Sequence, residues 1–309
     1  MLALIRELED RPPTKDEALT LFSACERDRA ALDALCGVAA SVRDRLMAGR
    51  DEREAAFNSV TPCHLRPLCL YCPYWHDGHS EPMTPDEAVG FVRQLHDESD
   101  IRQFHLSGGC SASSGEGRVL PIVRAIREAG FDDMRIVVNC GPSFDDKGLE
   151  ELARLGVLRV FSVFETTNPE VFKQVKPGDN LDEKLKFAER IARHGIGVGT
   201  GLMAGLGPHE TRWEDYAKSL FDVRGLVGLE VLYISKFRHA PGIEMNDHPE
   251  CDLDEARALL AMARLVLRDV HVRAAAGWGR DERLVAKAAG EGSISVERSF
   301  QKVEGACWG

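Results

Sequence analysis

The sequence predicts an α/β protein, a (β/α)8 barrel with an N-terminal helical extension. From residue 54 onward, eight short apolar runs alternate with amphipathic helical segments, which is the pattern of repeated βα units. The 309 residues suffice for a barrel of about 250 residues with an added helical segment. Hydrophobic residues make up 44% of the chain and charged residues 29%, a composition typical of water-soluble globular proteins.

The start of the chain has a helical pattern of its own. Thr14 and Glu17 form a capping box after two prolines, and apolar residues then recur at helical spacing from Leu19 to Cys36. We therefore expect three segments. They are a helical lead-in over residues 1–53, a barrel over residues 54–298 and a tail over residues 299–309.

The barrel strands are predicted at the short apolar runs. They are Ala55–Val60, Gln103–Ser107, Arg135–Asn139, Val157–Val163, Gly197–Met203, Leu229–Ile234, His271–Ala275 and Ser293–Val296. The first barrel helix begins at Thr84, where Thr-Pro-Asp-Glu supplies an N-cap, a first-turn proline and a capping-box glutamate. The other helices are Val119–Ala129, Leu149–Leu155, Leu181–His194, Glu210–Phe221, Asp254–Arg268 and Asp281–Ala289. Because active sites of such barrels lie at the C-terminal ends of the strands, residues that follow each strand are the candidates for function.

The net charge and the hydropathy of the chain argue against nucleic-acid and membrane partners. The net charge is −11 and no basic block is present, which argues against a nucleic-acid partner. No apolar run approaches the roughly 18 residues of a membrane span. The N-terminal segment MLALIRELED places acidic residues where a signal peptide needs an apolar core. These features predict a cytoplasmic protein without a membrane partner.

Three of the nine cysteines indicate a metal site. The odd number and the missing export signal disfavour a disulfide framework. Cys63, Cys69 and Cys72 follow the first predicted strand with the spacing C-x5-C-x2-C. Three thiolates can hold three irons of a [4Fe–4S] cluster and leave the fourth iron open, whereas electron-transfer clusters normally have four thiolates. The alternative is a structural zinc site, with a fourth ligand from His64, His76 or His79.

The residues around the last two cysteines carry a resemblance to a known family. Cys69-Leu70-Tyr71-Cys72 resembles the C-x-aromatic-C motif of radical S-adenosylmethionine (SAM) enzymes. Over about residues 14–298 the chain is similar to their biotin-synthase-like branch. The similarity lies in Gly108-Gly109, Glu165-Thr166, the glycine-rich segment 201–207 and Ala276-Gly277-Trp278.

This resemblance implies an activity and its cofactors. A [4Fe–4S] cluster would bind Cys63, Cys69 and Cys72, and SAM would bind the open iron. One electron from a reductant such as ferredoxin or flavodoxin would cleave SAM to methionine and a 5′-deoxyadenosyl radical. The radical would abstract hydrogen from a small-molecule substrate under anaerobic conditions.

Two departures from the common family pattern sharpen the resemblance. Five residues separate Cys63 from Cys69, where most members have three, and this spacing resembles the radical SAM proteins of [Fe]-hydrogenase maturation, which serve iron–guanylylpyridinol cofactor biosynthesis. The cysteines that hold a second cluster in biotin synthase align with His105, Val137 and Gly199, so we expect a single cluster. Two alternatives remain: a mutase or lyase similar to methylornithine synthase, and a zinc-stabilised binding protein.

The resemblance also assigns roles to individual residues. Each has an ordinary structural alternative, such as a turn glycine, a surface lysine or a core histidine. Lys184 would pair the SAM carboxylate, and Glu165 would bind its ribose or amino group. The full set expected to bind SAM is Tyr71, Ser107, Gly108, Gly109, Asn139, Glu165, Lys184, Met203 and Gly205. The residues expected to meet substrate are His105, Tyr233, Ser235 and Arg273.

Overall fold

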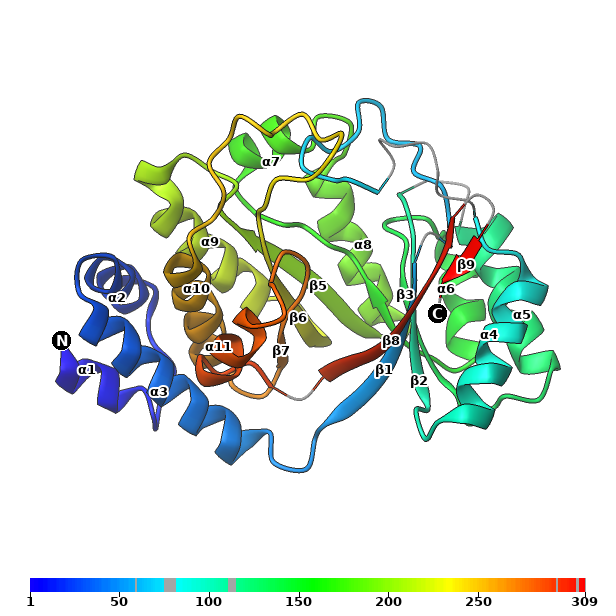
Figure 1. Ribbon diagram of the computed structural model, residues 1–309, viewed down its shortest axis with the longest axis horizontal. Helices are drawn as coiled ribbons and strands as arrows, with labels where there is room; N and C mark the ends of the chain where they lie inside the picture. Colours follow the sequence, from blue (N-terminus) through cyan, green and yellow to red (C-terminus); the bar gives the residue numbers. More distant parts are fainter. Residues whose placement is uncertain (59, 75–81, 111–114, 293, 304–305, 309) are drawn as a thin grey trace.

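The computed structural model describes residues 1–309 except 59, 75–81, 111–114, 293, 304–305 and 309. Eight parallel strands form a nearly closed barrel in the order β7-β6-β5-β4-β3-β2-β1-β8 (Figure 1). This confirms the predicted (β/α)8 fold. The strands are β1 Glu52–Asn58, β2 Gln103–Ser107, β3 Arg135–Asn139, β4 Val157–Phe161, β5 Gly197–Ala204, β6 Leu229–Lys236, β7 His271–Ala274 and β8 Ile294–Val303, with β9 Ala306–Trp308 antiparallel to β8.

Helices cover the outside of the barrel (Figure 1). They are α4 Pro85–Glu98, α5 Leu120–Glu128, α6 Asp146–Arg154, α7 Pro169–Val175, α8 Leu181–Arg193, α9 Arg212–Arg224, α10 Leu253–Val266 and α11 Glu282–Ala288. The capping box at Thr84 is present, since its hydroxyl accepts from the Glu87 N–H and its N–H donates to the Glu87 carboxylate. None of the described helices has the length and apolar character needed to cross a bilayer.

Three helices precede the barrel: α1 Leu2–Glu7, α2 Lys15–Arg27 and α3 Arg29–Leu46. The Thr14 capping box starts α2 as expected. Helices α2 and α3 lie against α9 and α10 (Figure 1). In this contact the Phe22 ring stacks on Trp213 at 5.1 Å between centroids. Their apolar side chains belong to the same core cluster as those of the barrel helices. The division at residue 53 stays a proposal.

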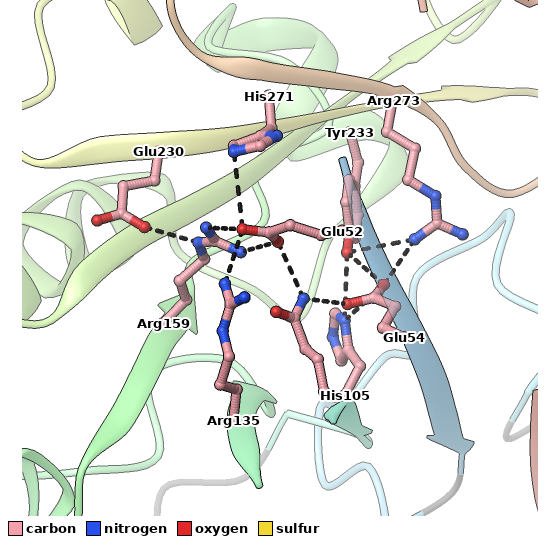
Figure 2. A network of polar contacts seen from close by, with 10 residues as sticks. Glu52, Glu54, His105, Arg135, Arg159, Glu230, Tyr233, His271 and Arg273 are labelled. Carbon is pink, nitrogen blue, oxygen red and sulfur yellow. Dashed lines mark hydrogen bonds and ion pairs between the residues drawn. The ribbon is translucent and has the colours of Figure 1, made fainter. Parts of the chain in front are cut away.

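Several elements differ from the sequence-based expectation, since β9 was not expected and β8 runs to Val303 rather than Val296, and two further differences concern α7 and β1. Helix α7 was not expected; the Asn168 side chain caps it by accepting from the N–H groups of Glu170 and Val171, and Pro169 occupies its first turn. Strand β1 begins at Glu52 rather than Ala55. A search for apolar runs does not detect the start of β1, since its first residues are charged. Glu52 and Glu54 point into the barrel and bind polar partners there (Figure 2).

Inward side chains of the barrel form three levels, because successive residues of a strand point to opposite faces. We call the lowest level the floor layer: Glu52, Gln103, Arg135, Arg159 and His271, together with Glu230, which lies at its rim and pairs with Arg159. The middle layer is Glu54, His105, Val137, Phe161, Tyr233 and Arg273. The mouth, at the C-terminal strand ends, includes Asn58, Ser107, Asn139 and Ser235.

The barrel has one weak seam. No ladder in the described part of the chain pairs β7 with β8. Two contacts among the described residues bridge this seam: the Gly292 N–H donates to the Val272 carbonyl at 3.1 Å, and the Ala274 N–H donates to the Glu291 carboxylate at 2.9 Å. The described residues thus join β7 to β8 at these points without forming a strand ladder.

Candidate functional site

A cavity of about 570 Å³ opens at the mouth of the barrel and collects most of the residues singled out in the sequence. We call it the mouth cavity. It brings together the three cysteines, the ends of β2, β3 and β5 and the segments after β4 and β6. The expected site residues that line it are Cys63, Cys69, Tyr71, Cys72, Ser107, Gly108, Gly109, Asn139, Glu165, Lys184, Met203 and Ser235.

Backbone hydrogen bonds hold the cysteine loop, residues 60–72, from several sides. On the β2 side, the Gly109 N–H donates to the Thr61 carbonyl at 2.8 Å, and the His64 N–H donates to the Cys110 carbonyl at 2.9 Å. On the α7 side, the Leu70 N–H donates to the Val175 carbonyl at 2.9 Å. The first cysteine is thus fixed beside β2 and the last two beside α7.

Close packing of the cysteine loop against the end of β2 explains why glycines follow this strand. A Cβ on Gly108 would clash with Thr61, and a Cβ on Gly109 would clash with the backbone of Cys63. A Cβ on Gly178, in the α7–α8 loop, would clash with the Pro67 carbonyl on the opposite side. The expectation was that bare backbone here approaches SAM. The structure adds another reason for the glycines, because they let the cysteine loop come into contact with β2.

The three thiols suit a cluster better than a single metal ion. Among the described residues, no three His, Cys, Asp or Glu side chains converge closely enough to bind one ion, as a structural zinc site requires. The cysteines of a [4Fe–4S] cluster instead surround it, each bound to its own iron. Burial raises the pKa of Cys69 to about 11 and that of Cys72 to about 12, so both lose their protons on binding iron. His76 and His79 lie outside the described residues.

Two buried lysines and a buried aspartate form a charged group beside the cysteines. The ammonium nitrogens of Lys176 and Lys184 lie 3.0 and 3.2 Å from Oδ2 of Asp179. All three side chains are at most 5% exposed, and all three line the mouth cavity. Oδ2 of Asp179 nevertheless has no well-directed hydrogen bond within the described residues. Lys184 is therefore no surface lysine, while Lys176 and Asp179 were missed because they stand in a turn, Lys-Pro-Gly-Asp, without strand or helix periodicity.

Glu165 is held in an unusual conformation that points it into the cavity. Its φ of 67° is in the left-handed region, and its backbone bonds to β5 through the carbonyl of Gly201 at 2.8 Å and the N–H of Met203 at 2.9 Å. Burial raises the pKa of its carboxyl, and the charges of Lys176 and Lys184 partly offset this. Its Oε2 is buried and has no hydrogen-bond partner among the described residues. Because α7 starts later, at Pro169, Glu165 is not a helix-start carboxylate.

The residues after Glu165 anchor it to α9. The Thr166 hydroxyl donates to the Asp215 carboxylate at 2.9 Å, and the Thr167 N–H donates to the Ser219 hydroxyl at 3.0 Å. Asp215 has hydroxyl partners but no paired cation in the described part of the chain, and burial raises its pKa to about 6. Sequence reasoning missed this support, since Asp215 looks like an ordinary first-turn helix acid.

Gly205 is placed differently from the expectation that it contacts adenine. Its N–H donates to the Tyr216 hydroxyl at 2.6 Å, and its carbonyl accepts from His248 at 2.7 Å. Its φ is 91°, and a Cβ would clash with Cys251. Gly205 does not line the mouth cavity, whereas Met203 does. A tight turn against Cys251 therefore explains this glycine.

The remaining expected substrate residues lie deeper. His105, Tyr233 and Arg273 line a second cavity of about 810 Å³, which we call the lumen cavity. Ser107 and Asn139 line both cavities, so the two adjoin. Figure 2 shows Glu54 at the centre of this group, where it accepts from Nη1 of Arg273 at 2.8 Å and from the Tyr233 hydroxyl at 3.2 Å. Glu54 was missed in the sequence.

The mouth cavity fits the two cofactors that the resemblance implies. SAM carries a carboxylate, an ammonium group and ribose hydroxyls. The buried lysines can pair the first, and the unpartnered oxygen of Glu165 can accept from either of the others. The three thiols beside them supply one ligand to each of three irons and leave one iron for SAM.

Comparison with known proteins supports this interpretation. The family model "Radical SAM superfamily" matches residues 58–220. The "Uncharacterized protein MJ0785" of Methanocaldococcus jannaschii is 27% identical over 266 residues, which are 84% of this chain and 68% of that protein. The 7,8-didemethyl-8-hydroxy-5-deazariboflavin synthase of Methanothermobacter thermautotrophicus is 26% identical over 245 residues, or 70% of each chain.

Among solved structures, methylornithine synthase superposes on 94% of this chain and 84% of its own, with a TM-score of 0.79 and 18% identity. At that identity the likeness shows the shared fold. The family match covers more than half of the chain and includes all three cysteines. The chain belongs to the radical SAM superfamily, as an enzyme of its biotin-synthase-like branch that uses a [4Fe–4S] cluster and SAM.

Proposed function

We propose that this radical SAM enzyme acts in biosynthesis of the iron–guanylylpyridinol cofactor of [Fe]-hydrogenase, where it builds part of the pyridinol ligand. The observation that carries the proposal is the C-x5-C-x2-C spacing of Cys63, Cys69 and Cys72. The longer loop is packed and not a loose insertion, because its Arg66-Pro67 segment contacts Gly178 closely. A protein from a methanogen is similar to this chain over most of its length, which is consistent with this role.

The proposal assigns the mouth residues as follows. Cys63, Cys69 and Cys72 hold three irons, and a ferredoxin or flavodoxin delivers the electron. When bound, the cluster and SAM supply the one-electron cleavage of SAM. Lys184, with Lys176, pairs the SAM carboxylate, and Glu165 accepts from its ribose or ammonium group. Backbone at Ser107–Gly109 with Asn139, and Tyr71 with Met203, complete the SAM contacts.

A single cluster is part of the proposal. Of the positions that would carry a second cluster in biotin synthase, Val137 packs in the small apolar cluster of the lumen. The Phe161 ring covers Gly199 so closely that a Cβ there would clash with it. The third position, His105, bonds to Tyr233. Valine and glycine cannot bind iron, and the space is left to a substrate.

The experiment has two stages. Protein purified and reconstituted anaerobically should contain about four iron and four sulfide per chain. With SAM and dithionite it should release 5′-deoxyadenosine, and Cys69→Ser should lose this release at least a hundredfold, because one iron loses its ligand. Cys251→Ser, in a buried cysteine outside the mouth cavity, is the matched control and should keep it.

The second stage tests the pathway. Reconstituted enzyme is added to an extract of a methanogen strain that lacks its own [Fe]-hydrogenase maturation radical SAM gene, and pyridinol products are measured by mass spectrometry. Restored pyridinol supports the proposal. An enzyme that cleaves SAM but restores none, or that instead forms methylornithine, overturns the pathway assignment and leaves the radical SAM chemistry intact.

A further inference from the structure

Two buried nitrogen atoms of the middle layer have no hydrogen-bond partner among the described residues: Nε of Arg273 and Nε2 of His105. The two residues are 7% and 5% exposed, and both line the lumen cavity. An unmade hydrogen bond at a buried polar atom is unfavourable, and more so at a charged group. A ligand in this cavity that bonded to both atoms would recover that free energy.

The guanidinium of Arg273 is held so that one edge stays available. Its Nη1 donates to Glu54 at 2.8 Å and to the Tyr233 hydroxyl at 3.4 Å, and its central carbon lies 5.1 Å from the Tyr233 ring centroid (Figure 2). These contacts use a single nitrogen. The opposite edge, made by Nε and Nη2, has no hydrogen bond in the part of the chain described. Such an edge binds a carboxylate through two parallel N–H···O bonds.

His105 presents the complementary group. Its Nδ1 lies 3.2 Å from the Tyr233 oxygen and 3.9 Å from the Glu54 carboxylate. The Tyr233 hydroxyl donates its one hydrogen to Glu54, so Nδ1 carries the hydrogen that it shares with the tyrosine oxygen. In the neutral ring, Nε2 is then an acceptor. The middle layer thus offers a donor pair at Arg273 and an acceptor at His105.

The position of this pair suits a small molecule that reaches up to the cofactors. His105 and Ser107 lie on the same face of β2, two residues or about 6.6 Å apart, and Ser107 also borders the mouth cavity. Arg280 and Lys287 line the lumen cavity and have no ion pair within the described residues, which adds positive charge. A ligand anchored at Arg273 would direct its other end towards SAM.

We propose that Arg273 and His105 form the anchoring subsite for the substrate, and that this substrate is a small carboxylic acid that also carries an O–H or N–H donor. The carboxylate binds the Nε/Nη2 edge of Arg273, and the donor bonds to Nε2 of His105. The inference rests on the proposed function and makes it more specific, since it requires the pyridinol precursor to be a carboxylic acid.

The test uses the reconstituted holoenzyme with SAM under anaerobic conditions. Titration calorimetry compares 6-hydroxypyridine-3-carboxylate with its carboxamide, which has the same shape without the charge. The wild type should bind the carboxylate at least tenfold more tightly. Arg273→Lys keeps a charge beside Glu54 but lacks the two-nitrogen edge, and it should reduce the preference to threefold or less. Arg193→Gln, at an exposed arginine on α8, should leave it unchanged.

A second variant distinguishes loss of the subsite from loss of folding. Glu54→Gln combined with Arg273→Met removes the buried pair as a unit and should also lose the preference. In each variant, 5′-deoxyadenosine release without substrate reports that the mouth is intact. Equal binding of the two probes by the wild type, no binding of either, or an unchanged preference in both variants overturns the subsite. A carboxylate preference together with no pyridinol in the extract overturns the pathway alone.

Discussion

The floor layer and the mouth both bury charged side chains, but they satisfy them differently. At the floor, Glu52 accepts from Arg159 at 2.6 and 2.8 Å and from Arg135 at 2.8 Å, and Arg159 also donates to Glu230 at 2.7 Å (Figure 2). At the mouth, Oε2 of Glu165 has no partner and Oδ2 of Asp179 has no well-directed one within the described residues. The charged side chains of the floor are paired by the chain itself, whereas these two oxygens at the mouth are left for the SAM that we propose binds there.

The pKa values of the buried carboxyl groups also differ between the floor and the mouth. Burial alone would raise the pKa of Glu52, but hydrogen bonds and charge from Arg159 lower it to about 2. At the mouth, burial raises the pKa of Glu165, and it raises that of Asp215 to about 6. A buried carboxylate with a fixed guanidinium partner stays charged at low cost, and one with hydroxyl partners or none does not.

The largest effect on stability is expected at the floor. Arg159→Met should leave Glu52 buried without its main partner and lower the free energy of unfolding by about 3–5 kcal/mol. Urea unfolding measures this, and SAM affinity of the folded protein should not change. Arg124→Met, which removes an exposed pair with Glu151, is the control and should cost no more than about 1 kcal/mol. A loss at Arg159 as small as the control's would remove the distinction between the two regions.

At the mouth, in contrast to the floor, a substitution should weaken SAM binding without lowering the stability of the protein. Glu165→Gln replaces a buried carboxyl whose Oε2 has no hydrogen-bond partner among the described residues and whose pKa burial raises, so the free energy of unfolding of the cofactor-free protein should not fall. SAM affinity should weaken about tenfold, the equivalent of about 1.4 kcal/mol, because the amide is a weaker acceptor. Calorimetry of SAM binding and thermal unfolding measure the two. A destabilised variant with unchanged SAM affinity would make Glu165 a structural residue.

The smallest effect concerns pH. Because the folded-state pKa of Asp215 is raised to about 6, its contribution to stability is full below about pH 4 and is lost as pH rises through 6. Between pH 5 and 7 the wild type should therefore lose about 1 kcal/mol relative to Asp215→Asn, which does not titrate. Urea midpoints of both proteins at the two pH values give the difference. A difference of the opposite sign would mean that Asp215 has a charged partner.

Local patterns were enough to predict the barrel. The Thr14 and Thr84 capping boxes begin helices as expected, and β2 and β3 have their predicted bounds, because each depends on neighbouring residues alone. The C-terminal-end rule also placed Cys63, Ser107, Asn139 and Glu165 together in one cavity.

The missed residues depend on contacts between segments far apart in the sequence. Glu54 and Arg159 are charged residues within strands, where an apolar pattern gives no signal, and their partners are on other strands. Lys176 and Asp179 are in a turn that reaches the site because Gly178 packs against the cysteine loop. The expected adenine contact of Gly205 stays a prediction; the residue does not line the mouth cavity, and a glycine-rich run does not show which of its glycines faces a ligand.

The lumen cavity extends to the seam between β7 and β8. Beside the seam, the cavity is lined by Arg283 and Leu284 on the α11 side and by Ser295 and Ser299 on β8, away from the cysteine loop. A molecule entering there would not pass the cysteines, Glu165 or Lys184 of the mouth cavity, where we propose that SAM binds. With the substrate in the lumen cavity and SAM in the mouth cavity, as proposed above, we expect either to bind first, and steady-state kinetics should show random rather than compulsory addition.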